Sequence, residues 1–129
     1  MKLFITGLLL LLALGSVDAA GVRKGETLRV QINTEKRSAK SKLTVRFVEL
    51  IEDSRCPTDT NCIWAGNAKI KVRVKKNGRS HDLTLDTNGA GQTVKVEGYS
   101  LKLTALTPEP RSNIRINRNG YVATFLIGK

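Results

Sequence analysis

Apolar and polar residues alternate along most of the chain that follows the N-terminal apolar segment. Such alternation is typical of antiparallel strands that bury one face, and no stretch of this region keeps a helical period. The apolar set changes parity at Phe47, because Val48 and Leu50 continue it, and this change predicts a β-bulge. The alternating stretches cover residues 28–32, 43–47, 69–75, 82–86 and 100–105.

An Asn-Gly pair at 77–78 separates two of these stretches and predicts a β-hairpin with a two-residue turn. This register places apolar residues opposite one another on the inner face. On the outer face it places Lys69 opposite Asp86 and Arg73 opposite Asp82, so the charges are complementary. Because apolar parity and charge agree, the pairing of this hairpin is predicted residue by residue.

A second Asn-Gly pair, at 119–120, predicts another hairpin, in which Ile114 faces Phe125. The strand that follows this pair carries Val122 and Leu126 on its other face. A strand that is apolar on both faces either is central and covered or borders an exposed patch. We expect the covered arrangement.

These features predict a single all-β domain over residues 20–129. Its natural architecture is a two-sheet antiparallel β-sandwich of roughly seven or eight strands, with the immunoglobulin-like arrangement as one form of it. A small β-barrel is the alternative architecture. The segment 34–41 is polar and basic, and we expect it to be a solvated loop.

The first residues of the chain have the pattern of a secretory signal peptide. Lys2 precedes an apolar run over residues 3–14, and residues 17–19, Val-Asp-Ala, are small residues at the cleavage positions. The apolar run is shorter than the roughly 20 residues that span a bilayer. We therefore expect residues 1–19 to be removed, the protein to be secreted or periplasmic, and no transmembrane segment to remain.

Both cysteines and the single tryptophan lie within the segment 53–66. In an oxidising compartment, the even number of cysteines predicts a disulfide between Cys56 and Cys62. Trp64 follows Cys62 by two residues, and we expect it to pack over the disulfide at one end of the sandwich. The alternative is that a rigid loop displays Ile63 and Trp64 as a hot spot for a protein partner.

The chain carries 22 Lys and Arg residues against 11 Asp and Glu residues, a net charge of +11. A small domain of this charge attracts anions. No aromatic residues alternate with the cations, so sequence-specific nucleic-acid binding is not expected. The outer face of the predicted hairpin carries Lys69, Lys71, Arg73 and Lys75, of which Lys71 and Lys75 face neutral residues. Two further clusters are Arg111, Arg115 and Arg118, and Lys36, Arg37, Lys40 and Lys42.

Candidate catalytic and metal-binding groups are sparse. The single histidine, His81, lies between Ser80 and Asp82, and neighbouring residues on a strand point to opposite faces, so these three residues cannot form a relay. A disulfide also removes both cysteines as nucleophiles or zinc ligands. The carboxylates near the disulfide loop match no calcium motif. We expect no enzyme, no cofactor and no metal site.

The Arg-Cys-Pro sequence at 55–57 is followed by four residues and then by Cys-Ile-Trp-Ala-Gly at 62–66. This segment resembles the RCP-x4-C-[VI]-W-A-G signature of an uncharacterised family of small exported bacterial proteins. The resemblance implies export, a disulfide and a β-rich domain, and it implies no activity. A position that is often acidic in that family is occupied by Asn67 here.

The sequence therefore predicts a monomeric, non-catalytic binding module. The expected ligand is an anionic cell-envelope component, either a polysaccharide or a lipid headgroup, bound through the face at 69–75 and the arginine cluster at 111–118. The alternative is an inhibitor of a secreted enzyme, in which the Cys56–Cys62 loop enters an acidic secreted protein as a wedge. Salt separates the two, because it weakens polyanion binding steeply and contacts of Trp64 much less.

Overall fold

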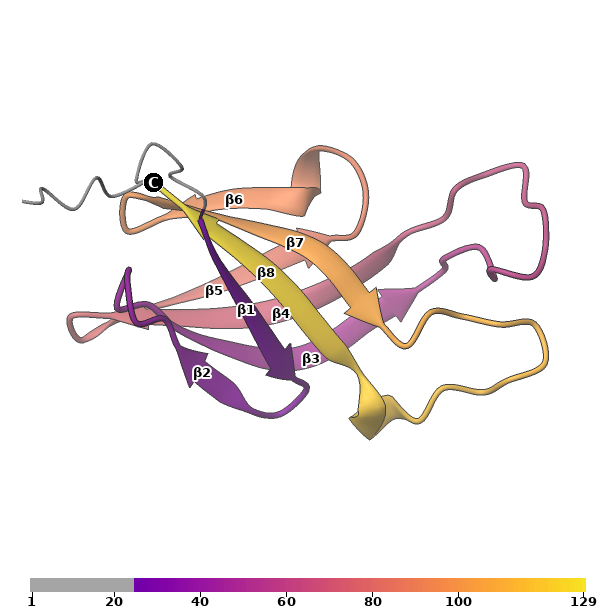
Figure 1. The fold of residues 1–129 in the computed structure, drawn as a ribbon, viewed down its shortest axis with the longest axis horizontal. Helices are drawn as coiled ribbons and strands as arrows, with labels where there is room; N and C mark the ends of the chain where they lie inside the picture. The colour runs from indigo at the N-terminus through magenta and orange to yellow at the C-terminus, as the bar shows by residue number, and fades with distance from the viewer. Residues whose placement is uncertain (1–24) are drawn as a thin grey trace, which may run out of the picture.

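The computed structural model describes residues 25–129, which form two four-stranded antiparallel sheets packed face to face (Figure 1). One sheet has the order β1-β8-β7-β6 and the other has the order β2-β3-β4-β5. The sheets are not closed into a barrel, so the predicted β-sandwich is confirmed. The predicted signal peptide, residues 1–19, lies outside the described residues. The strands are β1 (Glu26–Gln31), β2 (Glu35–Arg37), β3 (Thr44–Asp53), β4 (Ala68–Lys76), β5 (Arg79–Asp86), β6 (Thr93–Val96), β7 (Tyr99–Thr107) and β8 (Val122–Gly128), with short 3-10 helices η1 (Ala90–Gln92) and η2 (Arg118–Gly120).

The sheet order follows the chain order closely. Strands β2 to β5 are consecutive neighbours in one sheet, and β6 to β8 are consecutive neighbours in the other, where β1 pairs with β8. This connectivity differs from the immunoglobulin order, which places the second and third strands in different sheets. Because most pairings are hairpins between neighbours in sequence, local turn signals carry much of the topology.

The core lies between the inner faces of the two sheets and consists of the residues that alternate with polar ones in the sequence. Phe47 of β3 and Phe125 of β8 are its largest fully buried side chains. The pairing of β3 with β4 shifts between Phe47 and Glu49, which confirms the predicted β-bulge. The bulge adds one residue, so Leu50 returns to the inner side opposite Ile70.

The predicted hairpin of β4 and β5 is confirmed at each position. Lys69 lies opposite Asp86, Arg73 lies opposite Asp82, and Val74 lies opposite His81. The turn uses left-handed backbone at Asn77 and Gly78, with φ values of 51° and 77°. This backbone conformation is the one that a two-residue hairpin turn requires and that Asn-Gly supplies.

The prediction of a hairpin at Asn119-Gly120 is wrong. Residues 118–120 form η2, in which the Asn117 side chain accepts a hydrogen bond from the Asn119 N–H at 3.0 Å. Strand β8 instead pairs with β1 and β7, and Ile114 is exposed and does not face Phe125. An Asn side chain that binds the main chain two residues ahead favours a local turn over a strand.

The prediction that the outer face of β8 is covered is also wrong. Strand β8 is central, as expected, but Leu126 is 36 % exposed between Thr27 of β1 and Lys102 of β7. A central strand is hydrogen bonded along both edges, but this pairing does not cover either of its faces. Val122 is half-buried on the same face.

The segment 34–41 is more ordered than the predicted solvated loop. Residues 35–37 form the edge strand β2, and Ser38 and Ser41 are buried. The Glu26 carboxylate accepts hydrogen bonds from the Ser38 hydroxyl and from the main-chain N–H groups of Ala39 and Lys40. A carboxylate supplied from β1 therefore organises this turn, which no local pattern in 34–41 indicates.

The connections gather at opposite ends of the sandwich (Figure 1). We call the end formed by the β3–β4 loop, residues 54–67, and the β7–β8 connection, residues 108–121, the loop end. The β4–β5 turn lies at the other end, close to the turn that joins β2 to β3.

Candidate binding surface

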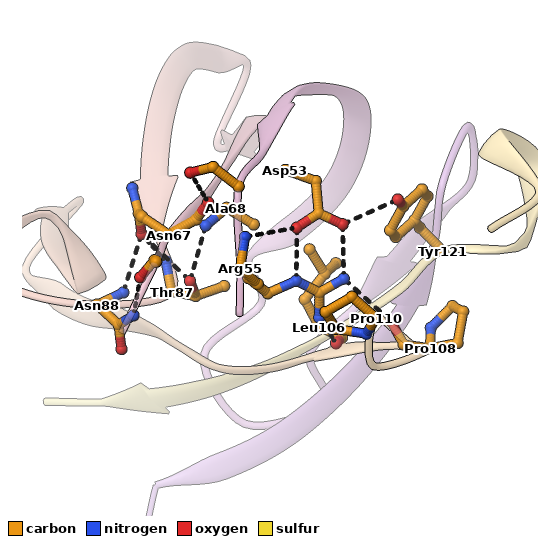
Figure 2. A network of polar contacts seen from close by, with 12 residues as sticks. Asp53, Arg55, Asn67, Ala68, Thr87, Asn88, Leu106, Pro108, Pro110 and Tyr121 are labelled. Atoms are coloured by element: carbon orange, nitrogen blue, oxygen red, sulfur yellow. Dashed lines mark hydrogen bonds and ion pairs between the residues drawn. The ribbon is translucent and has the colours of Figure 1, made fainter. Parts of the chain in front are cut away.

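Asp53 and Arg55 form the polar centre of the loop end (Figure 2). The Arg55 guanidinium binds the Asp53 carboxylate through two hydrogen bonds, with Nε–Oδ1 at 2.7 Å and Nη2–Oδ2 at 2.8 Å. The Tyr121 hydroxyl donates to Asp53 Oδ2 at 3.0 Å. Arg55 also donates to the carbonyl oxygens of Leu106 and Pro108, at 2.6 and 3.0 Å. One largely buried ion pair thus ties the end of β3 to the other sheet.

The pKa shifts of Asp53 and Tyr121 agree with the hydrogen bonds at this ion pair. Burial raises the pKa of Asp53, but the hydrogen bonds and charge of Arg55, together with the Tyr121 hydroxyl, outweigh it and hold this pKa below its ordinary value. Burial, and then the hydrogen bond to Asp53 and its charge, raise the pKa of Tyr121. At neutral pH the carboxyl group is therefore an ionised acceptor and the phenol a neutral donor.

Asn67 fixes the base of the β3–β4 loop (Figure 2). Its Nδ2 donates to Asp86 Oδ1 at 3.1 Å, and its Oδ1 accepts from the N–H groups of Thr87 and Asn88 at 3.1 and 3.2 Å. Its carbonyl oxygen accepts from the Ser54 N–H at 2.7 Å. An acidic side chain at position 67 could accept the same bonds but would place a like charge beside Asp86, which explains the asparagine.

Gly66 closes the same loop. Its φ is 72°, and a Cβ at this position would collide with the main chain of Ser54, Arg55 and Cys56. The Cys56 N–H donates to the carbonyl oxygen of Ala65 at 3.4 Å, so the two ends of the loop lie side by side. Only glycine combines this backbone conformation with so close an approach of two chain segments.

The β3–β4 loop is braced within itself and against the β7–β8 connection. The predicted disulfide between Cys56 and Cys62 is present. The Thr58 N–H donates to the carbonyl oxygen of Pro110 at 2.9 Å. The N–H and hydroxyl of Ser112 donate to the two carboxylate oxygens of Asp59, at 3.0 and 2.6 Å, and these bonds lower the pKa of Asp59. Two long loops from different sheets thus form one surface.

Three large apolar side chains project from this surface. Ile63 is 93 % exposed, Trp64 is 80 % exposed and Ile114 is 62 % exposed. The expectation that Trp64 packs over the disulfide is therefore wrong, because the tip of the loop points away from the sandwich. The three arginines of the 111–118 cluster are also exposed and come from the same loop as Ile114.

Three of the four basic residues on the outer face of β4 lie opposite an acidic residue on a neighbouring strand. Lys69 lies between Glu52 of β3 and Asp86 of β5. Arg73 binds Asp82 with Nε–Oδ1 at 2.7 Å, and this hydrogen bond is the main cause that lowers the pKa of Asp82. Lys71 lies opposite Glu49, a partner on β3 that the hairpin register alone does not reveal. Lys75 lies between Thr44 and Ser80 and is exposed.

His81 is engaged by a carboxylate. Its Nε2 lies 2.7 Å from Glu97 Oε1, and this hydrogen bond is the main cause that lowers the pKa of Glu97. Within residues 25–129, no serine, threonine or cysteine side chain is hydrogen bonded to His81, and no cluster of three or more His, Cys, Asp or Glu side chains is placed to hold a metal ion. No helix in this range has the length and apolar character of a membrane span.

No family model, curated protein or solved structure matches the chain. The family resemblance at 53–66 therefore stays a prediction. Three contributors to the loop end were not predicted as such: Arg55, Tyr121 and Ile114. Two of them could have been identified from the sequence. Arg55 is a cation that lies between Asp53 and the first cysteine, and Ile114 is an apolar residue in a polar segment that follows a proline.

Proposed function

We propose that this protein is a non-catalytic binding module that docks a secreted protein partner through the loop end, with Trp64 as the central contact. The observation that carries the proposal is an indole that is 80 % exposed on a loop held by a disulfide and by hydrogen bonds to neighbouring segments. Tryptophan is among the residues that are enriched in binding hot spots. If the partner is a secreted enzyme and the loop enters its active-site cleft, the protein is an inhibitor of that enzyme.

The rigidity of the loop supports binding. Association costs the entropy of ordering flexible segments, and a loop that is already fixed avoids much of that cost. The Arg55 ion pair, the Asn67 contacts and the Asp59–Ser112 bonds all lie below the exposed tip and leave it free. The tip can therefore enter a partner without rearranging the sandwich.

The chemistry of the surface defines the partner. Ile63 and Trp64 would fit an apolar pocket on the partner. The exposed arginines in the same loop as Ile114 would be complementary to acidic residues around that pocket. An acidic secreted protein fits this description. Catalysis is left out of the proposal because His81 is hydrogen bonded to Glu97, and no serine, threonine or cysteine side chain within residues 25–129 is hydrogen bonded to it.

The test is retention of secreted proteins on the immobilised protein and on two variants. Trp64→Ser removes the central contact, and Leu126→Ser is a matched control that removes a partly exposed apolar side chain from the outer face of β8. A partner retained by the parent at about 1 M ionic strength should be retained equally by Leu126→Ser. Trp64→Ser should weaken this binding by about 2 kcal/mol or more, roughly thirtyfold in Kd. Equal retention by both variants would refute the proposal.

A further inference from the structure

A basic hollow of about 360 Å³ lies at the end of the sandwich opposite the loop end, beside the β4–β5 turn. Strands β2, β3, β4 and β5 and the turns between them contribute to it. Among residues 25–129, neither an acidic nor an aromatic side chain lines it. We call this feature the basic hollow and define it by its five cationic residues: Arg37, Lys42, Lys75, Lys76 and Arg79.

The register of the sheet places these cations. Arg37 of β2 lies opposite Thr44 of β3, and Thr44 lies opposite Lys75 of β4. The two cations thus flank a threonine across three strands, with their strands separated by about 10 Å. Left-handed backbone at Lys42, with φ of 63°, and at the Asn77-Gly78 turn brings the remaining cations to the same hollow.

Most of these charges lack an acidic partner. Among the ion pairs of residues 25–129, only Arg79 of the five takes part, at 3.7 Å from Glu97. Lys76 is held by neutral groups, since its Nζ donates to the Ser41 carbonyl oxygen at 2.8 Å and lies 4.6 Å from the centre of the Tyr99 ring. Like charges that share a concave surface focus a positive potential, which an anion relieves.

We propose that the basic hollow binds an acidic polysaccharide through its sulfate, phosphate or carboxylate groups. This proposal is separate from the proposed function, because the ligand is a polysaccharide instead of a protein and the site lies at the opposite end of the molecule. The lining favours a polysaccharide over a membrane, since the described part of the chain contributes no apolar side chain to it that could enter a bilayer. It also has no aromatic ring on which a nucleic-acid base could stack.

The test compares two double variants of the full chain that lose the same charge from the same sheet. Arg37→Gln/Lys75→Gln removes two positive charges from the hollow. Lys69→Gln/Lys71→Gln is the matched control, because both lysines lie opposite acidic residues on β3. The probe is a labelled heparin oligosaccharide, titrated at several salt concentrations. The hollow variant should lower the slope of log affinity against log salt by about 2, and the control should lower it clearly less. Circular dichroism checks that both variants fold.

Two results would overturn the proposal. Equal losses in the two double variants would mean that net charge alone attracts the oligosaccharide. Binding of the parent to vesicles of phosphatidylcholine and phosphatidylglycerol that depends on the hollow, without binding of the oligosaccharide, would assign the site to a membrane surface. A failure of the Trp64→Ser test leaves this outcome unaffected, because that test concerns the other end of the molecule.

Discussion

At the scale of single residues, Arg55 is the side chain on which the loop end depends most. It lies next to the first cysteine, yet its guanidinium reaches Asp53 and two carbonyl oxygens near the end of β7. These contacts hold the base of the loop, whereas Ile63 and Trp64 are exposed at its tip. The Arg-Cys-Pro sequence thus combines an ion pair that anchors the loop with the bridge that closes it.

Arg55→Gln is expected to lower the free energy of unfolding by about 2–4 kcal/mol at pH 7, because it leaves Asp53 largely buried without its charge partner. Arg111→Gln removes an exposed arginine from the adjacent loop and should change stability by no more than about 0.5 kcal/mol. Urea denaturation of the three proteins measures both values. Equal stabilities would show that the ion pair contributes little.

The same variants give a pH test. The pKa of Asp53 is lowered in the folded protein, so its contribution to stability is present above its unfolded pKa, about 3.9, and is lost as pH falls through the folded value. The stability difference between the parent and Arg55→Gln should therefore shrink below about pH 4. A difference that stays constant on acidification would assign the effect to the carbonyl contacts of Arg55 alone.

At the scale of elements, the β3–β4 loop is built as a braced hairpin extension. The disulfide, Gly66 and Asn67 fix its base, and the Asp59–Ser112 bonds fix its side. Its tip contributes almost nothing to the core. The contacts that stabilise this element and its proposed binding residues are therefore different, so stability and the proposed binding can be measured separately.

Cys56→Ala/Cys62→Ala is expected to lower the free energy of unfolding by about 2 kcal/mol, because the bridge restricts the unfolded chain. The emission maximum of Trp64 should be that of an exposed indole in both proteins, since its side chain is already in solvent. Thermal denaturation and fluorescence emission measure the two effects. An emission maximum that moves to longer wavelength on loss of the bridge would mean that the indole packs on it in solution.

The elements also show what local sequence can predict. The β4–β5 hairpin was predicted in full because turn chemistry, apolar alternation and cross-strand charge agree there. The Asn119-Gly120 turn offered the same dipeptide, but the segment before it has only Ile114 and Ile116 as apolar residues. A strand needs a sustained buried face, and two residues do not supply it.

The candidate site was predicted less well than the fold. The disulfide follows from the cysteine count, whereas the exposure of Trp64 depends on where its loop lies relative to Pro110 and Ser112. Likewise, Lys71 lies opposite Thr84 in the hairpin, but the pairing of β3 with β4 also places it opposite Glu49. The basic hollow joins Arg37 and Lys75 across a third strand. Contacts between segments distant in sequence leave no local pattern to interpret.

At the scale of the whole molecule, the two candidate surfaces lie at opposite ends of one sandwich (Figure 1). Ile63 and Trp64 at the tip of the β3–β4 loop are not part of the basic hollow, and the paired strands of the sandwich lie between the two surfaces. The two surfaces differ in chemistry: the loop end combines exposed apolar side chains with arginines, and the basic hollow is lined by cations and neutral polar residues. Such a molecule could hold a protein partner while it is attached to an acidic polysaccharide.

The two surfaces should therefore act independently. Effects of substitutions at distant sites with no shared partners usually add. Trp64→Ser should leave the salt dependence of heparin binding unchanged, and Arg37→Gln/Lys75→Gln should leave retention of the protein partner at high salt unchanged. The triple variant should show both losses with the sizes measured separately. If Trp64→Ser also weakened heparin binding, the polysaccharide would reach the loop end, and the exposed arginines at 111–118 would form part of one extended anion site.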